Sequence, residues 1–487
     1  MGSEETTTNN NKSESNNKLS MLESIRGRSL GGIRVSRGEL RRKMTMPAYL
    51  RLALRDAMSA KSVDSGKRHF GVTSLCMVDN GEGEKSPLGT PESPVVVFVN
   101  SKSGGRQGCA LKNKLEELMA EETGFLYKIL SPPLTIILFV MKVLDLQTVK
   151  PHEFVEYGLR CLETFADLGD SCAKEIRERL RIVVAGGDGT VGWVLGCLGE
   201  LKRQGREPVP PTAIIPLGTG NDLSRNFGWG GSFPFNWRTA IKKMLDRALN
   251  APICRLDSWN LVISMPAGAE LDVPYSLKHT EEVILDQDLE RVGRLPKEVS
   301  CYQGVFYNYF SIGMDAQVAY SFHHLRNEKP YLAHSPIANK IIYSGYGCKQ
   351  GWFFTPCITD PTLRGLKNIL RLHIKRLHSH QWEMIRLPAS IRSIVALNLH
   401  SYASGRNPWG NLKPEYLEKK GFVEAKSDDG LLEIFGFKHG WHASFVMVDL
   451  ISAKHIAQIM MMIFTRHLKK EIAMMYENLE ANQNQKQ

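Results

Sequence analysis

The chain has 487 residues, 42% of them hydrophobic and 23% charged, and a formal net charge of +11. This length predicts two to four domains, and the composition is typical of a soluble globular protein. The charge indicates an anionic partner; because no helix-turn-helix, zinc-finger or RNA-binding signature occurs, an acidic membrane surface is a better interpretation than nucleic acid. The nine cysteines are scattered without a Cys-x-x-Cys pair, which argues against a disulfide framework and a zinc site.

The N-terminal part of the chain is polar and then basic. Residues 1–24 are rich in Asn, Ser, Thr and Glu and are expected to be disordered, and no apolar run that would make a secretion signal follows the start. Residues 25–93 form a basic region and a linker. Within it, residues 44–58 have the spacing of an amphipathic helix, which either lies on anionic lipid or packs on the next domain.

A first strand is predicted at residues 95–99, five apolar residues without alternation. It runs into a polar loop with Asn100, Ser103 and Gly104, whose groups are suited to phosphate, although such loops are common. An apolar insertion follows at residues 123–142; its unbroken run at 134–141 is too short to cross a bilayer, which takes about 20 residues.

Two glycine-rich turns are the most informative features, and each follows an apolar run. The first turn contains Asp188 and the second contains Asp222. The order strand, glycine turn, helix places backbone N–H groups at a helix start, where phosphate binds. Neither turn has the spacing of a P-loop or of the dinucleotide fingerprint. Because ligands of open α/β sheets lie at the carboxyl ends of the strands, the turns and the polar loop predict one nucleotide site and phosphoryl transfer.

These segments carry a family resemblance. Residues 95–458 resemble the diacylglycerol kinases, most closely the compact plant type that lacks cysteine-rich zinc domains. A lone Gly-Gly-Asp-Gly-Thr is shared with other kinases, but the ordered set of segments is specific; it comprises residues 100–105, 186–195, 216–225, 256–260, 308–316, 322–326 and 428–433. The resemblance implies a three-layer, Rossmann-like α/β nucleotide domain at 94–250, a mainly β, sandwich-like accessory domain at 251–458, and an active site in the cleft between them.

The resemblance also implies the reaction and its residues. The ATP γ-phosphate would pass to the hydroxyl of diacylglycerol, with Mg²⁺ present, to give the signalling lipid phosphatidic acid. Asp188 and Asp429 compete as the general base. Asp257 is the expected magnesium-site or site-organising carboxylate, although the residues alone also fit turn positions for Asp257 and Asp429. The expected ATP-binding residues are Asn100, Ser103, Gly104, Gly186, Gly187, Gly189, Thr190, Gly218, Thr219, Gly220, Asn221 and Asp222.

The C-terminal part departs from the family pattern after Gln458. Apolar residues recur every three to five positions from Ile456 to Leu479 among basic ones, which predicts an amphipathic helix within residues 459–487. Such a helix suits calmodulin or a membrane surface, or packs on the second domain. The departure leaves a catalytically inactive regulator as an alternative to the kinase; a kinase for NAD or a sphingoid base is a weaker one. The expected location is cytoplasmic, at membrane surfaces but without a transmembrane helix.

Overall fold

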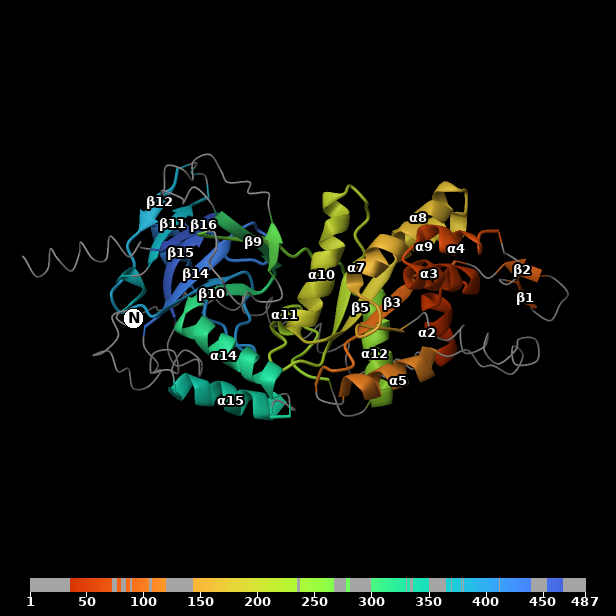
Figure 1. Ribbon diagram of the computed structural model, residues 1–487, viewed down its shortest axis with the longest axis horizontal. Helices are drawn as coiled ribbons and strands as arrows, with labels where there is room; N and C mark the ends of the chain where they lie inside the picture. Colours follow the sequence, from red (N-terminus) through yellow and green to blue (C-terminus); the bar gives the residue numbers. More distant parts are fainter. Residues whose placement is uncertain are drawn as a thin grey trace, which may run out of the picture.

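The computed structural model is shown in Figure 1. It describes residues 36–71, 77–79, 85–87, 90–104, 107–119, 143–233, 237–266, 277–280, 299–329, 331–332, 336–349, 365–368, 370–377, 379, 381–410, 412–438 and 453–466. The parallel sheet with its helices forms one group of elements and the antiparallel sheets form another, with α11 where the two groups meet (Figure 1). The N-terminal 24 residues and the apolar insertion lie outside the described residues.

A four-stranded parallel sheet is the centre of the first domain. Its strand order is β4 (Val143–Asp145), β3 (Val95–Val99), β5 (Arg181–Gly186) and β6 (Thr212–Pro216). Val96 and Phe98 face one hydrophobic core, whereas Val95, Val97 and Val99 face another. The continuous apolar run of β3 is therefore explained by burial on both faces of the sheet.

Helices cover both faces of this sheet, which makes three layers. One core lies under α3 (Ala48–Ala60), the π-helical turn η3 (Phe154–Leu159), which follows the short helix α7 (Pro151–Glu153), and under α8 (Arg160–Asp167), α9 (Ser171–Arg179) and α10 (Asp188–Arg203). The other lies under α2 (Arg37–Met44), α5 (Gln107–Met119) and α12 (Trp237–Asn250). Short elements complete the group: α4 (Val63–Lys67), α11 (Asp222–Asn226) and the hairpin β1 (Met77–Asp79) and β2 (Lys85–Pro87). The Rossmann-like assignment of this sheet stays a prediction.

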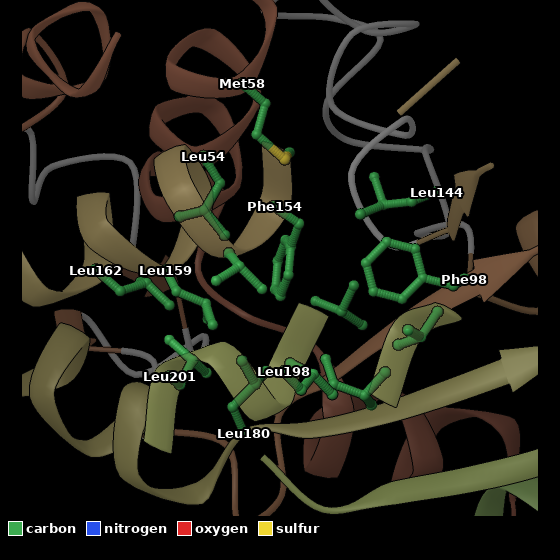
Figure 2. Close-up of a cluster of buried hydrophobic side chains, with 14 of the residues drawn as sticks. Leu54, Met58, Phe98, Leu144, Phe154, Leu159, Leu162, Leu180, Leu198 and Leu201 are labelled. Carbon is green, nitrogen blue, oxygen red and sulfur yellow. The ribbon is translucent and has the colours of Figure 1, made fainter. Parts of the chain in front are cut away.

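The basic N-terminal region contributes helix α3 to the first core. Leu50, Ala53 and Leu54 are at most 1% exposed, and Figure 2 shows Leu54 in the cluster with Phe98 of β3 and Phe154 of η3. The phenol of Tyr49 donates a hydrogen bond of 2.7 Å to Asp170 at the start of α9. Of the two interpretations of this helix, packing on the next domain is therefore the one observed.

The second domain is rich in antiparallel strands. Its sheets have the orders β10 (Tyr309–Gly313), β13 (Ser393–Leu397), β14 (Leu432–Phe437), β15 (Lys454–Ile459); β12 (Glu383–Ile385), β11 (Leu370–Lys375), β16 (Met461–Arg466); and β7 (Trp259–Pro266), β9 (Val299–Phe306), β8 (Lys278–Thr280). Ile394 and Ile434 of the first sheet share a core with Leu372 and Ile374 of the second. The helical elements are α14 (Met314–Glu328), α15 (Pro336–Lys349), η5 (Leu366–Asn368) and α16 (Pro414–Lys420).

The predicted amphipathic helix at the C-terminus is wrong as far as the structure describes it. Residues 454–459 and 461–466 are strands, β15 pairing with β14 and β16 with β11. Ala457 and Ile459 alternate into the core, and Met462 and Phe464 pack against it. The apolar residues in this segment are so frequent that they fit the two-residue period of a strand as well as the period of a helix. Pairing with distant strands therefore decides which of the two structures forms. Residues 467–487, with the predicted calmodulin or membrane contact, lie outside the described residues.

The sequence predicts no transmembrane helix. Within the part of the chain that the structure describes, no helix has both the length and the apolar character that spanning a bilayer requires.

Candidate active site

The loops that follow β3, β5 and β6 pack directly against one another. Leu217 donates its N–H to the Gly186 carbonyl over 2.9 Å, and Asn100 Nδ2 donates to Thr190 Oγ1 over 3.0 Å. A Cβ on Gly218 would lie 2.6 Å from the Gly187 Cα atom, so only glycine permits this approach. The predicted convergence of the three loops at one edge of the sheet is confirmed.

Asn221 shapes the second glycine turn from inside. It has φ 55°, in the left-handed region, and is 1% exposed. Its Oδ1 accepts from Gly218 N–H over 2.9 Å, and its Nδ2 donates to the carbonyls of Gly218 and Gly231. The Asn221 side chain, which was expected to contact the nucleotide, is therefore hydrogen-bonded to backbone groups of the turn itself.

The N-terminus of α10 lies among the residues predicted to bind the nucleotide. Gly187 is its N-cap and makes no side-chain cap bond, and Gly189 in the first turn is exposed. The first N–H groups of a helix have no intrahelical partner and carry a partial positive charge. Thr219 lies across from this turn, since Gly218 contacts Gly187. This arrangement is able to hold phosphate oxygens.

Asp188, the first residue of α10, places a carboxyl group between the two glycine turns. Its carboxylate accepts the backbone N–H of Asp222 over 2.7 Å and that of Leu223 over 3.2 Å. Burial, followed by the negative charge of Asp222, raises the pKa of Asp188 to about 6, although these N–H groups and a bond with Asn308 oppose the shift. A carboxyl with a near-neutral pKa is suited to general base catalysis.

Asp222 joins the second glycine turn to the second domain. Its carboxylate is 3% exposed and accepts from Ser401 Oγ over 2.7 Å, Gly405 N over 2.8 Å and Ser404 N over 3.2 Å. Nearby, the N–H of His400 donates to an Asn226 oxygen over 3.1 Å. The side chain predicted to contact the nucleotide is therefore engaged with residues 401–405.

Asp257 and Asp429 share one turn of the second domain. Asp257 Oδ2 accepts from Gly430 N over 2.5 Å. The carboxylate of Asp429 accepts from Leu431 N over 2.9 Å and from Lys426 N over 3.0 Å. Burial, and then the charges of Asp257 and Glu433, raise the pKa of Asp429. Both acids therefore make the turn contacts that the sequence analysis gave as an alternative to a catalytic role. The raised pKa of Asp429 keeps it a candidate for the general base.

A chain of hydrogen bonds runs from the backbone of Asp257 toward Asp188. Asn398 is fully buried and its Nδ2 donates to the carbonyls of Asp257, over 3.0 Å, and Tyr307, over 2.7 Å. The N–H of Asn398 donates to the Asn308 carbonyl over 2.9 Å, and the Asn308 side chain is hydrogen-bonded to Asp188. Asn398 therefore lies between the backbone of Asp257 and Asn308, whose side chain bonds to Asp188.

Sequence reasoning missed the second-domain residues of the site. Asn398 and Ser401 follow β13, and Asn339 of α15 donates to Thr219 Oγ1 over 2.9 Å. No local pattern marks them, because isolated Asn and Ser residues are common on any surface.

The carboxylates of the candidate site could each contribute one ligand to Mg²⁺, but they do not form a cluster of ligands. Among the described residues, no group of three or more His, Cys, Asp or Glu side chains is placed to hold a metal. Mg²⁺ is usually bound through one or two carboxylates together with substrate phosphates and water. Asp257, with one oxygen on Gly430 N–H, is consistent with that kind of site.

Curated proteins similar to this chain are diacylglycerol kinases. Diacylglycerol kinase 4 of Arabidopsis thaliana is 63% identical over 88% of this chain and 82% of its own length. Diacylglycerol kinase 1 of Oryza sativa subsp. japonica is 36% identical over 80% of this chain and 74% of its own. The crystal structure of a diacylglycerol kinase from Bacillus anthracis str. Sterne aligns with a TM-score of 0.33 and 17% identity over 77% of this chain and 86% of that one, a likeness too remote to support a conclusion.

Two family models match the chain. The diacylglycerol kinase catalytic domain matches residues 142–251, and the diacylglycerol kinase accessory domain matches residues 305–475. The second match extends beyond Gln458, so the expected departure from the family at that residue is wrong. From these matches and its relatives, the chain belongs to the diacylglycerol kinase family.

Proposed function

We propose that this protein is an ATP-dependent diacylglycerol kinase, which transfers the γ-phosphate of ATP to the free hydroxyl of 1,2-diacylglycerol and releases ADP and phosphatidic acid. The family membership supports the reaction. The observation that carries the assignment to this site is the meeting of three strand-end loops around Asp188. Positioning and charge neutralisation supply most of the rate of phosphoryl transfer, and such loops provide both.

The nucleotide phosphates are assigned to the first turn of α10 and the residues that face it. Gly187, Gly189 and the N–H groups around them would bind phosphate oxygens, with Ser103 and Thr219 at the edges. A second group of the predicted residues shapes the site instead, because their side chains or their lack of a Cβ serve loop packing: Asn100, Gly104, Gly186, Thr190, Gly218, Asn221 and Asp222.

The general base is assigned to one of two carboxylates, Asp188 and Asp429. A lipid hydroxyl is a weak nucleophile, so a group within hydrogen-bond reach must take its proton as the bond to phosphorus forms. Both acids have a raised pKa and both accept two backbone N–H bonds, so these contacts rank them equally. Kinetics can separate them, as described below.

Mg²⁺ and the membrane complete the proposal. When bound, Mg²⁺ would neutralise charge on the phosphate oxygens, and Asp257 is the residue assigned to hold it. Diacylglycerol resides in bilayers, so the enzyme must work at a membrane surface. The net charge of +11 favours a surface rich in anionic lipid.

The test is phosphatidic acid production by the purified protein with labelled ATP, Mg²⁺ and diacylglycerol in mixed micelles. Asp188→Asn and Asp429→Asn are compared with Asp167→Asn, an exposed acid at the end of α8. Loss of the base should lower kcat by about 10²-fold or more, and the variant whose residual rate no longer falls at acid pH identifies it. A folded wild type that makes no product would overturn the assignment, and so would equal rates in all variants.

A further inference from the structure

The α14–α15 hairpin is packed on the side where its two helices meet and exposes several large apolar side chains elsewhere; we call the exposed side its outer face. Val318 and Phe322 of α14 are buried, and the Phe322 ring lies 4.4 Å from that of Tyr343 of α15, which holds the two helices together. Large apolar side chains nevertheless face water along the hairpin: Tyr320 on α14 (51% exposed), Tyr331 (70%) and Leu332 (41%) in the connection, and Ile341 on α15 (67%). Several such residues on one helical pair are typical of an interaction surface.

The hairpin lies beside the nucleotide turn. Asn339, two residues before the exposed Ile341, donates its amide hydrogen to Thr219 Oγ1 over 2.9 Å. At the other end, α14 follows directly on β10, whose preceding residue Asn308 bonds to Asp188. In Figure 1 α15 is the outermost element at this side of the second domain, with α14 between it and the sheets. A surface that binds the outer face would therefore be close to the reacting groups.

The charge of the hairpin favours an anionic partner. Residues 314–349 contain lysine or arginine at 326, 329, 340 and 349 and acids only at 315 and 328. The Asp315 carboxyl is used inside the domain, where Tyr402 and Ser311 hydrogen-bond to it. Glu328 is paired with His324 over 3.1 Å. Lys and Arg around exposed Tyr, Leu and Ile are typical of helices that lie in the headgroup region of a bilayer.

We propose that the outer face of the α14–α15 hairpin docks the enzyme on an anionic lipid bilayer. The proposal rests on the diacylglycerol kinase function, because that substrate is dissolved in the bilayer with its hydroxyl at headgroup level. Tyr331, Leu332 and Ile341 enter the headgroup region, while Lys329 pairs with lipid phosphates and carboxylates. Helix α3, the candidate from the sequence, has its apolar face in the protein core and is excluded from this role.

The direct test is cosedimentation with vesicles of phosphatidylcholine and phosphatidylserine in equal parts. Tyr331→Gln combined with Ile341→Gln should weaken binding about tenfold, which corresponds to about 1.4 kcal/mol. The matched control is Leu168→Gln combined with Met384→Gln; these side chains are 53% and 51% exposed. Leu168 follows α8 and Met384 is in β12, and both elements lie away from the hairpin in Figure 1. This control should bind like wild type.

Charge reversal tests the electrostatic part. Lys329→Glu should weaken vesicle binding about tenfold at low salt and less at high salt. Lys174→Glu, at an exposed position of α9 in the first domain, should leave binding unchanged.

Two substrate forms separate docking from catalysis. With diacylglycerol in vesicles the hairpin variants should lose activity, whereas with short-chain diacylglycerol dissolved as monomers they should retain the wild-type rate. If the wild type phosphorylates neither form, the kinase function fails, while vesicle binding still decides the role of the hairpin. Hairpin variants that bind vesicles like wild type, controls that lose as much binding, or a wild type that binds no vesicles would each overturn the proposal; the last result would leave this face to a protein partner.

Discussion

Replacing Asp188 by asparagine should change how the stability of the protein depends on pH. The pKa of this carboxyl is raised from 3.8 to about 6 in the folded protein. The folded state therefore binds the proton more tightly than the unfolded state does. The stabilisation that results is fully present below the unfolded pKa and is lost as the pH rises through the folded pKa, between roughly pH 4 and pH 7.

The magnitude follows from the two pKa values. At pH 5 the folded carboxyl is largely protonated while the unfolded one is largely ionised, and at pH 7.5 both are ionised. Linkage then gives a loss of about 1 kcal/mol from the free energy of unfolding between pH 5 and pH 7.5. An asparagine side chain cannot titrate, so Asp188→Asn should lack this loss and gain about 1 kcal/mol relative to wild type over the same interval.

Urea unfolding of both proteins at both pH values measures this difference. The change in unfolding free energy between the two pH values is subtracted between variant and wild type. The contributions of other titrating groups then cancel, provided that these groups are not coupled to Asp188. The negative charge of Asp222 is the second cause of the raised pKa, so Asp222→Asn should shrink the pH effect. The reasoning would be refuted if wild type and variant changed equally in unfolding free energy between the two pH values. It would also be refuted if the wild type became more stable relative to the variant from pH 5 to pH 7.5.

Three further changes probe packing. Gly218→Ala places a methyl group 2.6 Å from the Gly187 Cα atom and should cost about 1–3 kcal/mol; Gly196→Ala in α10, with nothing within 4 Å, is its control, and equal unfolding energies would contradict the close approach. Glu433→Ala removes the acceptor of His455 and Gln458 inside the second domain and should cost about 3–5 kcal/mol, measured by denaturation. Leu54→Ala should lower the unfolding energy by about 2–5 kcal/mol; no change would mean that α3 is not part of the core.

The glycine turns were predictable because their geometry is local. A buried strand, a turn that needs glycine and a helix start are adjacent in the sequence, and parallel strands bring their carboxyl ends to one edge. Asn221 shows the limit of this reasoning. Its polar side chain suggested a ligand for the nucleotide, but the left-handed backbone and the bonds to Gly218 and Gly231 give it a structural role.

The second-domain part of the site was not predictable from local pattern. Asn398 and Ser401 act across 141 and 179 residues of sequence, on Asp257 and Asp222. The C-terminal strands were missed for the same reason, since β16 pairs with β11 in a register from Lys375–Met461 to Leu370–Arg466. The inactive-regulator alternative rested on the loss of strands after Gln458, and β16 is such a strand, so this support for the alternative is gone.

Helix α11 explains how the two domains act on one carboxylate. The first turn of α11 donates two N–H groups to Asp188, and in the same turn the Asp222 side chain is bound by residues 401–405 of the second domain. The second domain also acts on Asp188 directly, because the Asn308 side chain is hydrogen-bonded to it. Separating the domains would remove this bond, which favours the ionised form of Asp188, so the arrangement of the domains is linked to the basicity of the site.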